Sequence, residues 1–274
     1  MGSDTFILIP GAGGRAWYWH LVAARLEQRG HEAVPVALPA ADDTAGLPEY
    51  ADAVIRVIGN REPRRVVLVA QSLAGFIAPL VCKQVPVASL VLVNAMIPKP
   101  GERPGEWWTN TRHDEAKREQ NGRDGRSAEA PFDPFLEFFH DVPQPIIDAA
   151  WAQGEPRQSE TVFGSPCTFE IWPAAATRVL SARDDRFSPA EFQRRVARER
   201  LGISGDEMCG GHLAALSQQD ELTARLVTYA TRQHDGAAQP SGAVRRGSIA
   251  AGAGRQCAPA ALIGRFYAAP QLHR

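Results

Sequence analysis

The stretch Arg65–Gly75, RVVLVAQSLAG, reads as a buried strand that runs directly into a tight turn and then into a helix. Its apolar run, Val66–Ala70, is short and rich in valine, as is typical of a strand in a parallel sheet. A strand-to-helix turn of this kind presents its central serine, here Ser72, as a nucleophile. Such a turn needs small residues on either side, and Ala70 and Ala74 stand where glycine is usual. Ser72 is therefore a candidate nucleophile, and the alternative is a serine that merely follows an apolar strand.

Further apolar runs alternate with helical patterns along the chain, and they predict strands at residues 5–9, 32–38, 88–93 and 177–182. A short strand-like segment follows at residues 205–208. Strands that alternate with helices, without hairpin signals between them, form right-handed βαβ units. The chain is therefore predicted to have an α/β fold, with a mostly parallel sheet of about six strands flanked by helices.

Length and composition favour one domain that carries an insertion. With 274 residues, of which 44% are hydrophobic, the chain can bury a sizeable core but is short for two independent domains. Residues 1–97 and 171–234 are predicted to form the α/β core. Residues 98–170 are first polar and then rich in aromatics, which favours a helical cap; the alternative is a plain insertion packed on the core. Residues 235–274, rich in Ala, Gly and Arg, are expected to form a low-complexity, flexible tail.

The charge pattern favours a small-molecule partner. The formal net charge is −1 and no long basic run is present, so neither nucleic acid nor an anionic membrane surface is expected. No apolar stretch approaches the ~20 residues that span a bilayer, and residues 1–14 are not expected to act as a targeting signal. The cysteines lack C-x-x-C spacing, which predicts a reduced, cytoplasmic protein without a zinc site; they are Cys82, Cys167, Cys209 and Cys257. A homodimer is left open.

A glycine loop, Gly11–Gly14, follows the first predicted strand, and two functions compete for it. Gly11, Gly13 and Ala16 match the dinucleotide fingerprint G-x-G-x-x-G/A in a strand-to-helix context. That function requires an acidic residue at the end of the next strand, where the chain has Ala37, Leu38 and Pro39 instead. We therefore expect the loop to bind a developing oxyanion, and we expect no cofactor.

Three polar residues follow three predicted strands: Ser72, then Asp184 or Asp185, then His212. The carboxyl ends of parallel strands share one crevice, so these side chains can converge there. An imidazole accepts the proton of a serine nucleophile, and a carboxylate holds that imidazole in the correct tautomer. Spacing favours Asp185, which lies four residues before Pro189. Ser72, Asp185 and His212 are thus the predicted catalytic residues.

The remaining requirements are an oxyanion hole and a pocket. The amides of Ala12 and Leu73 are predicted to hold the oxyanion, since these donors usually come from the first loop and from the residue after the nucleophile. Gly11 is expected to let the backbone approach the substrate. Gln71, directly before the nucleophile, is a further candidate substrate-binding residue. Aromatic residues of the cap are candidates to line a pocket for aromatic or medium-chain groups, namely Trp107, Trp108, Phe135, Phe138, Phe139 and Trp151.

Four motifs carry a family resemblance: residues 11–19 (GAGGRAWYW), 70–75 (AQSLAG), 93–98 (VNAMIP) and 210–216 (GGHLAAL). Across about residues 5–233 the chain resembles the α/β-hydrolase superfamily. The motifs are similar to the branch that holds plant methylesterases and hydroxynitrile lyases. Ala70 and Gln71 depart from the usual Gly-His, and Pro10 replaces the customary histidine of the oxyanion loop. The resemblance implies an α/β-hydrolase fold with a helical cap and an esterase that forms an acyl-enzyme on Ser72.

Two other functions remain open at this stage. Hydroxynitrile lyases of this branch carry a threonine in the oxyanion loop and a lysine after the catalytic histidine, where this chain has Gly11 and Leu213. The absence of that lysine favours hydrolysis of a small, largely apolar ester. A non-catalytic small-molecule-binding protein on the same scaffold is the third alternative, because a fold alone does not decide an activity.

Overall fold

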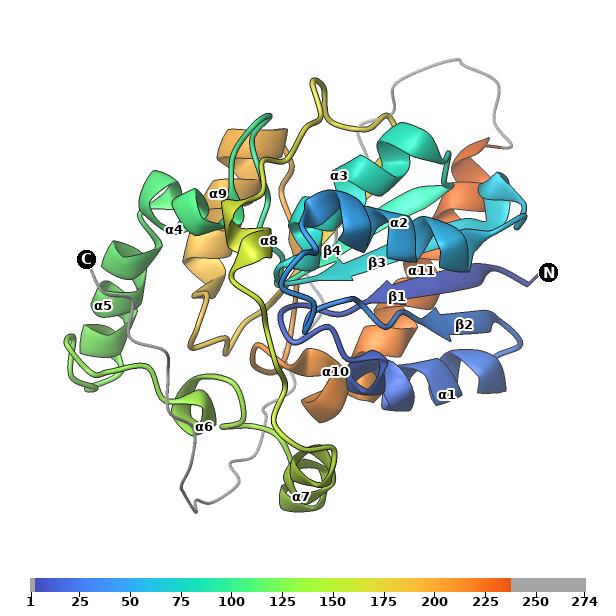
Figure 1. Cartoon of the computed structure of the whole chain (residues 1–274). Coiled ribbons are helices and arrows are strands. Elements are labelled where there is room, and N and C mark those ends of the chain that lie inside the picture. The colour runs from blue at the N-terminus through green and yellow to red at the C-terminus, as the bar shows by residue number, and fades with distance from the viewer. Residues whose placement is uncertain (1–2, 238–274) are drawn as a thin grey trace.

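Six parallel strands form the centre of the molecule, in the order β2-β1-β3-β4-β5-β6 (Figure 1). The computed structural model describes residues 3–237, so most of the predicted tail lies outside the described residues. The predicted parallel sheet of about six strands is confirmed. The strands are β1 (Thr5–Ile9), β2 (Glu32–Pro35), β3 (Val66–Gln71), β4 (Ser89–Val93), β5 (Ala176–Ala182) and β6 (Asp206–Met208).

Helices cover both faces of this sheet. Because successive side chains of a strand point to opposite faces, Phe6 and Leu8 of β1 pack in one hydrophobic cluster while Ile7 and Ile9 pack in the other. The first cluster lies under α1 (His20–Gln28) and α11 (Gln219–Ala237). The second lies under α2 (Leu47–Ile58), α3 (Ala74–Gln84) and α9 (Ala190–Leu201). Shorter elements are the 3-10 helices η1 (Ala16–Trp19) and η2 (Pro63–Arg65) and the helix α10 (Ala214–Ser217).

The insertion between β4 and β5 consists of short helices on the side toward which the strands run (Figure 1). Trp107 and Val162 of this insertion belong to the same hydrophobic cluster as α2 and α3. The division into a core and a separate cap at residues 98–170 therefore stays a prediction. The helices are α4 (Pro104–Thr111), α5 (His113–Arg123), α6 (Pro134–Glu137), α7 (Gln144–Ala152) and α8 (Thr161–Gly164).

The parallel arrangement brings the loops that follow the strands to one edge of the sheet. Ser72 follows β3, Asn94 follows β4, Asp185 follows β5 and His212 follows β6. In an open parallel sheet this edge is where ligands bind. None of the helices within residues 3–237 has the length and hydropathy needed to cross a membrane.

Candidate active site

Ser72 occupies the turn between β3 and α3 with a left-handed backbone, at φ 52°. This conformation is strained for a residue other than glycine, and neighbouring main-chain bonds hold it. The Ser72 amide donates to the Val93 carbonyl at 3.2 Å, and the Ser72 carbonyl accepts from the amides of Gly75 at 3.0 Å and Met96 at 2.9 Å. The turn therefore fixes the position of the hydroxyl at the end of the strand.

His212 connects Ser72 to a buried carboxylate. Its Nδ1 lies 2.8 Å from Oδ2 of Asp185, and its Nε2 lies 3.1 Å from Oγ of Ser72. A carboxylate can only accept here, so Nδ1 carries the proton and Nε2 is free to accept the serine proton. Since His212 and Asp185 are both buried, solvent screens this pair weakly.

Asp185, in the turn after β5, accepts four hydrogen bonds, including the one from His212. The Asp185 carboxylate accepts from the amides of Phe187 at 2.9 Å and Ser188 at 2.8 Å, and from Nε2 of Gln193 at 3.1 Å. His113 of α5 holds the same turn, because its Nε2 lies 2.8 Å from the Phe187 carbonyl. Neither the contact of Gln193 with Asp185 nor that of His113 with Phe187 was predicted from the sequence.

Asp184, the alternative acid, binds the Gly210 amide and not the His212 imidazole. Its Oδ2 accepts a hydrogen bond from the Gly210 amide at 3.1 Å, and about half of its side chain is exposed. Asp184 thus supports the loop that carries His212 without contacting the imidazole.

The two amides predicted for the oxyanion hole flank the Ser72 turn. Within the described part of the chain, neither the Ala12 amide nor the Leu73 amide donates to another protein group. Gly11 lies so close to the turn that a Cβ there would stand 2.8 Å from Cβ of Ser72. Gln71 links these parts: its Oε1 accepts from the Gly11 amide at 2.9 Å, and its Nε2 donates to the His212 carbonyl at 3.4 Å.

Asn94 is a positioning residue that sequence reasoning missed. Its Nδ2 donates to the carbonyls of Gly211 and His212, each at 3.2 Å, and its Oδ1 accepts from the Ala182 amide at 2.7 Å. Asn94 is buried and has a left-handed backbone, at φ 46°. The sequence signal was available, since Asn94 directly follows a predicted strand and asparagine tolerates this conformation better than most residues.

Aromatic rings enclose the imidazole of His212. Phe138 stacks on it with ring centroids 5.0 Å apart and planes inclined by 22°, and Phe187 contacts it edge-on at 5.0 Å. The two rings give the buried imidazole apolar surroundings.

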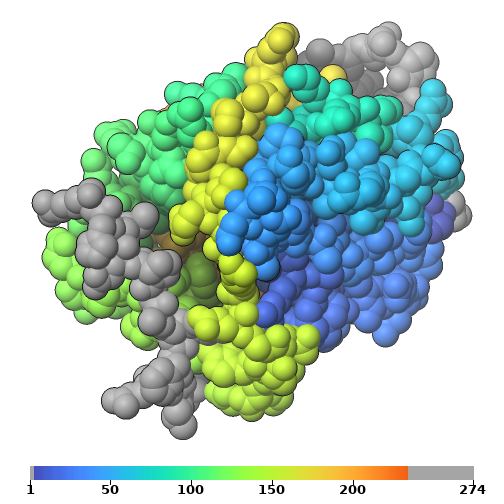
Figure 2. All heavy atoms as spheres, viewed as in Figure 1, coloured from blue at the N-terminus to red at the C-terminus, as the bar shows by residue number. Residues whose placement is uncertain are grey.

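A pocket of about 850 Å³ opens beside this arrangement, and it includes Gly11, Ala12 and Gln71. Figure 2 shows a hollow beside the yellow segment that precedes β5. Three of the predicted aromatic residues line the pocket: Phe138, Phe139 and Trp151. Other apolar lining residues, which were not predicted, are Trp17, Tyr18, Phe132, Phe163, Leu213 and Leu216. Burial raises the pKa of the Tyr18 phenol, so this pocket hydroxyl keeps its proton.

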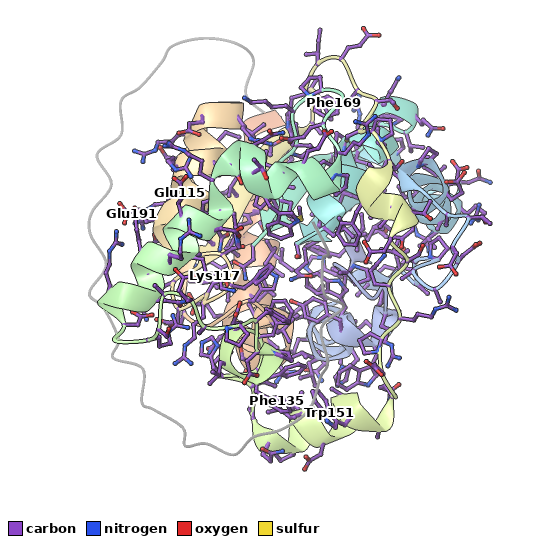
Figure 3. All side chains as sticks on the ribbon, turned by 60° about the vertical axis from the view of Figure 1, so that its left-hand side comes forward. Glu115, Lys117, Phe135, Trp151, Phe169 and Glu191 are labelled. Atoms are coloured by element: carbon purple, nitrogen blue, oxygen red, sulfur yellow. The ribbon has the colours of Figure 1, made fainter. Side chains whose placement is uncertain are left out.

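The expectation that Trp107, Trp108 and Phe135 line the pocket is not met, since none of them belongs to its wall. Trp107 is buried in the core, where its indole N–H donates to the Ile97 carbonyl at 3.0 Å. Trp108 packs edge-on against Phe187 at 5.5 Å. Phe135 lies behind the wall, 5.1 Å from the Trp151 ring, and Figure 3 shows the two side chains next to each other near α7.

A strap formed by residues 153–158 covers the glycine loop. Arg15 donates to three of its carbonyls, those of Gln153 at 2.8 Å, Gly154 at 2.7 Å and Glu155 at 2.7 Å. The Gly13 amide donates to Oε1 of Gln158 at 2.8 Å. These bonds fix the strap as one wall of the pocket, and both ends of the strap line it.

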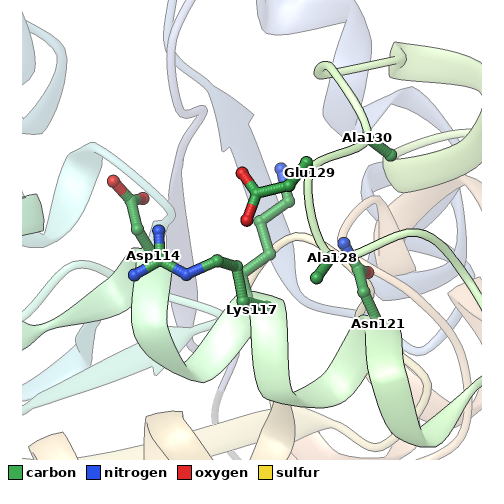
Figure 4. Close-up of a pocket in the computed structure, with 7 residues that line it drawn as sticks. Asp114, Lys117, Asn121, Ala128, Glu129 and Ala130 are labelled. Carbon is green, nitrogen blue, oxygen red and sulfur yellow. The ribbon is translucent and has the colours of Figure 1, made fainter.

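A second hollow, of about 170 Å³, lies on α5 and includes none of the residues discussed above (Figure 4). Acidic and basic side chains surround it together, among them Asp114, Lys117 and Glu129. Lys117 is paired with Glu137 at 2.7 Å. Within residues 3–237, no group of three or more His, Cys, Asp or Glu side chains is arranged to hold a metal ion.

A serine, a histidine and a carboxylate joined at the carboxyl ends of a parallel sheet, with the amides of a glycine loop nearby, define the α/β-hydrolase class of fold and site. The chain belongs to the alpha/beta hydrolase family, whose sequence profile matches residues 6–226. The predicted family resemblance is thus confirmed.

Curated relatives include plant esterases. The chain is 32% identical over 114 residues to a rice (Oryza sativa) protein described as a probable esterase, PIR7A, a match that covers 38% of this chain and 43% of the rice protein. It is 32% identical over 104 residues to methylesterase 7 of Arabidopsis thaliana, covering 34% of this chain and 40% of that protein. These matches span less than half the length of either relative.

Solved structures share the fold over most of the chain. Polyneuridine aldehyde esterase matches with a TM-score of 0.67 at 18% identity, covering 84% of this chain and all (100%) of that one. A pyrethroid hydrolase from Sphingobium faniae JZ-2 matches with a TM-score of 0.65 at 20% identity, covering 85% and 100%. At these identities the similarity concerns the fold.

Proposed function

We propose that this protein is a carboxylesterase that cleaves a small, largely apolar ester through an acyl-enzyme on Ser72. The observation that supports this most is the hydrogen-bonded series from Ser72 through His212 to Asp185, beside a pocket with aromatic walls. The names of the relatives, esterase and methylesterase, support ester hydrolysis in general.

In the first step, Oγ of Ser72 attacks the ester carbonyl while Nε2 of His212 takes the hydroxyl proton. The carbonyl oxygen becomes an oxyanion, which the amides of Ala12 and Leu73 stabilise. Asp185 stabilises the resulting imidazolium through Nδ1. Collapse of the intermediate breaks the bond to the alcohol, and His212 gives its proton to the leaving oxygen.

In the second step, water attacks the acyl group on Ser72. Nε2 of His212 takes a proton from this water and then returns one to Oγ of Ser72, which releases the carboxylic acid and restores the enzyme. Every proton transfer in this sequence uses one nitrogen of His212. The sequence of steps needs no cofactor.

The pocket supports an uncharged substrate. The basic side chains in its wall are engaged, since Arg15 binds three carbonyls and Arg157 pairs with Asp43 at 2.8 Å. Glu155 and Glu160 also line the pocket. A substrate with a free carboxylate would meet these acids without a free cation in that wall, and so would bind poorly.

The test is turnover of a panel of p-nitrophenyl esters and of one cyanohydrin by the wild type, Ser72→Ala and Ser89→Ala. Ser89 is a buried serine at the first residue of β4, the end of that strand away from Ser72, and it serves as the matched control. Ser72→Ala is expected to lower kcat by about 10⁴-fold or more, while Ser89→Ala keeps wild-type kcat. Mass spectrometry of the quenched wild type should detect an acyl adduct on Ser72.

Three results would contradict the proposal. Ester turnover that persists in Ser72→Ala would show that Ser72 is not the nucleophile. Faster cleavage of the cyanohydrin than of any ester would favour the lyase alternative, and a wild type that binds these esters without turning them over would favour a binding protein.

A further inference from the structure

The segment Phe138–Asp141, between α6 and α7, lies directly against the loop that carries His212. Phe138 stacks on the His212 ring. His140 reaches the backbone next to it, because a Cβ on Gly211 would lie 2.5 Å from Cε1 of His140. The insertion therefore contacts both the side chain of the general base and the backbone before it.

Asp141 makes a polar bond from the insertion to the His212 loop. Its Oδ2 accepts a hydrogen bond from the Gly211 amide at 2.7 Å. Hydrogen bonds to a carboxylate are shorter and stronger than bonds between neutral groups. The amide of Gly211 would otherwise lie in a largely buried place without an acceptor, which is unfavourable.

The opposite side of the same residue is held from the core. The Gly211 carbonyl accepts from Nδ2 of Asn94 at 3.2 Å, and the amide of the preceding residue, Gly210, donates to Asp184 at 3.1 Å. Two successive amides of this loop are thus bound by two carboxylates, one from the core and one from the insertion. His212 is the next residue along the chain.

We propose that Asp141 is a positioning residue for His212, acting through the Gly211 amide. This inference rests on the proposed function, in which His212 transfers the protons. Without the Asp141 bond, the loop is anchored from the core side alone, and the imidazole can move relative to Ser72. A displacement of about 1 Å at a reacting group is enough to reduce a rate by about 10²-fold.

The experiment compares Asp141→Ala with Asp141→Asn, in the full chain with p-nitrophenyl butyrate. The asparagine side-chain oxygen can still accept from the Gly211 amide, so this variant keeps the bond without the charge. Asp141→Ala is expected to lower kcat by about 10- to 100-fold with KM within about 2-fold of the wild type, and Asp141→Asn should restore kcat to within about 3-fold.

Asp133→Ala is the matched control for loosening of the insertion. Asp133 is an acidic residue of the same insertion, at the start of α6, and its Oδ1 accepts from the amides of Phe135 and Leu136, away from the His212 loop. Its loss should leave kcat unchanged. An equal fall of kcat in Asp133→Ala and Asp141→Ala would overturn the positioning role, since both variants would then act through general loosening.

A second measurement keeps this inference separate from the proposed function. The proton that His212 Nδ1 shares with Asp185 gives a downfield NMR resonance, which should persist in Asp141→Asn and broaden or shift in Asp141→Ala. An unchanged resonance together with wild-type kcat in Asp141→Ala would overturn the inference alone. Persisting turnover in Ser72→Ala would overturn the proposed function, and the resonance would still test the position of His212.

Discussion

The side-chain oxygen of Gln71 accepts a hydrogen bond from the Gly11 amide at 2.9 Å, which joins the residue before Ser72 to the loop after β1. The same side chain donates to the His212 carbonyl at 3.4 Å. One amide group thus connects the nucleophile turn, the glycine loop and the His212 loop. An amide does not titrate, so these connections are kept over the whole pH range in which the protein is folded.

Gln71→Leu should lower kcat/KM by about 100-fold, because the Gly11 amide loses its acceptor and the neighbouring Ala12 amide leaves its place beside Ser72. Gln84→Leu, at the exposed end of α3, is the control and should keep wild-type kinetics. Steady-state assays of both variants with one ester check this. Wild-type kcat/KM in Gln71→Leu would exclude the first loop from oxyanion binding.

Asp185→Asn should lower kcat by about 10⁴-fold, because an amide at this position favours the wrong imidazole tautomer. Asp184→Asn should stay within about 3-fold of the wild type, since the asparagine oxygen can still accept from the Gly210 amide. The kcat values of the two variants, measured side by side, assign the acid. Comparable losses in both would contradict the assignment to Asp185.

Arg15→Ala should relax the preference for acyl-chain length, because the strap at residues 153–158 loses three hydrogen bonds and the pocket can widen. The ratio of kcat/KM between the best acyl chain and one that is four carbons longer is expected to fall by about 3- to 10-fold. Arg56→Ala, on the exposed face of α2, is the matched control. An unchanged ratio would mean that the strap does not limit the pocket.

Gly75→Ala should destabilise the protein by about 2–4 kcal/mol. Gly75 lies in the first turn of α3, and a Cβ there would overlap the carbonyl of Met96, in the segment after β4. Gly122, in the last turn of α5, has no atom within 4 Å of the corresponding position. Gly122→Ala should therefore stabilise by about 0.5–1 kcal/mol. Urea denaturation measures the free energy of unfolding of both variants, which should change in opposite directions.

Burial lowers the pKa of His140, against the opposing effect of the Asp141 carboxylate. Below the unfolded-state pKa of about 6.5, the unfolded chain therefore binds this proton more readily than the folded protein does. The free energy of unfolding should fall as the pH drops from 6.5 to the lower pKa of the folded state. His140→Gln cannot titrate and should lose less stability between pH 7.5 and pH 5.5 in urea denaturation, and an equal loss would contradict this.

The sequence predicted the residues that follow strands. Ser72 and Asp185 each follow a local apolar run, and His212 follows the short strand-like segment at residues 205–208. The geometry of a parallel sheet brings such positions together regardless of their separation along the chain. The spacing to Pro189 also separated Asp185 from Asp184, and the structure has Asp185 beside the imidazole. The chemical roles of these residues stay predictions.

The supporting contacts could not be predicted, because they depend on packing between distant segments. Asn94 lies 118 residues from His212 in the sequence and Asp141 lies 70 residues from Gly211, so the local pattern does not indicate which partner either side chain contacts. Trp107 was misplaced for a related reason. Because Trp107 stands in a polar segment, it was predicted to line the pocket. In the structure, α4 directs the Trp107 side chain into the core.

The insertion contacts three of the loops that the proposed chemistry uses: Gln158 binds Gly13, His113 binds Phe187 in the Asp185 turn, and Asp141 binds Gly211. The sheet itself requires none of these contacts, since its strands pair with one another. During folding, the strands can therefore assemble before the catalytic geometry exists. We therefore expect a chain with native secondary structure and an undocked insertion to lack activity, because the loops that carry Gly13, Phe187 and Gly211 would lose these contacts.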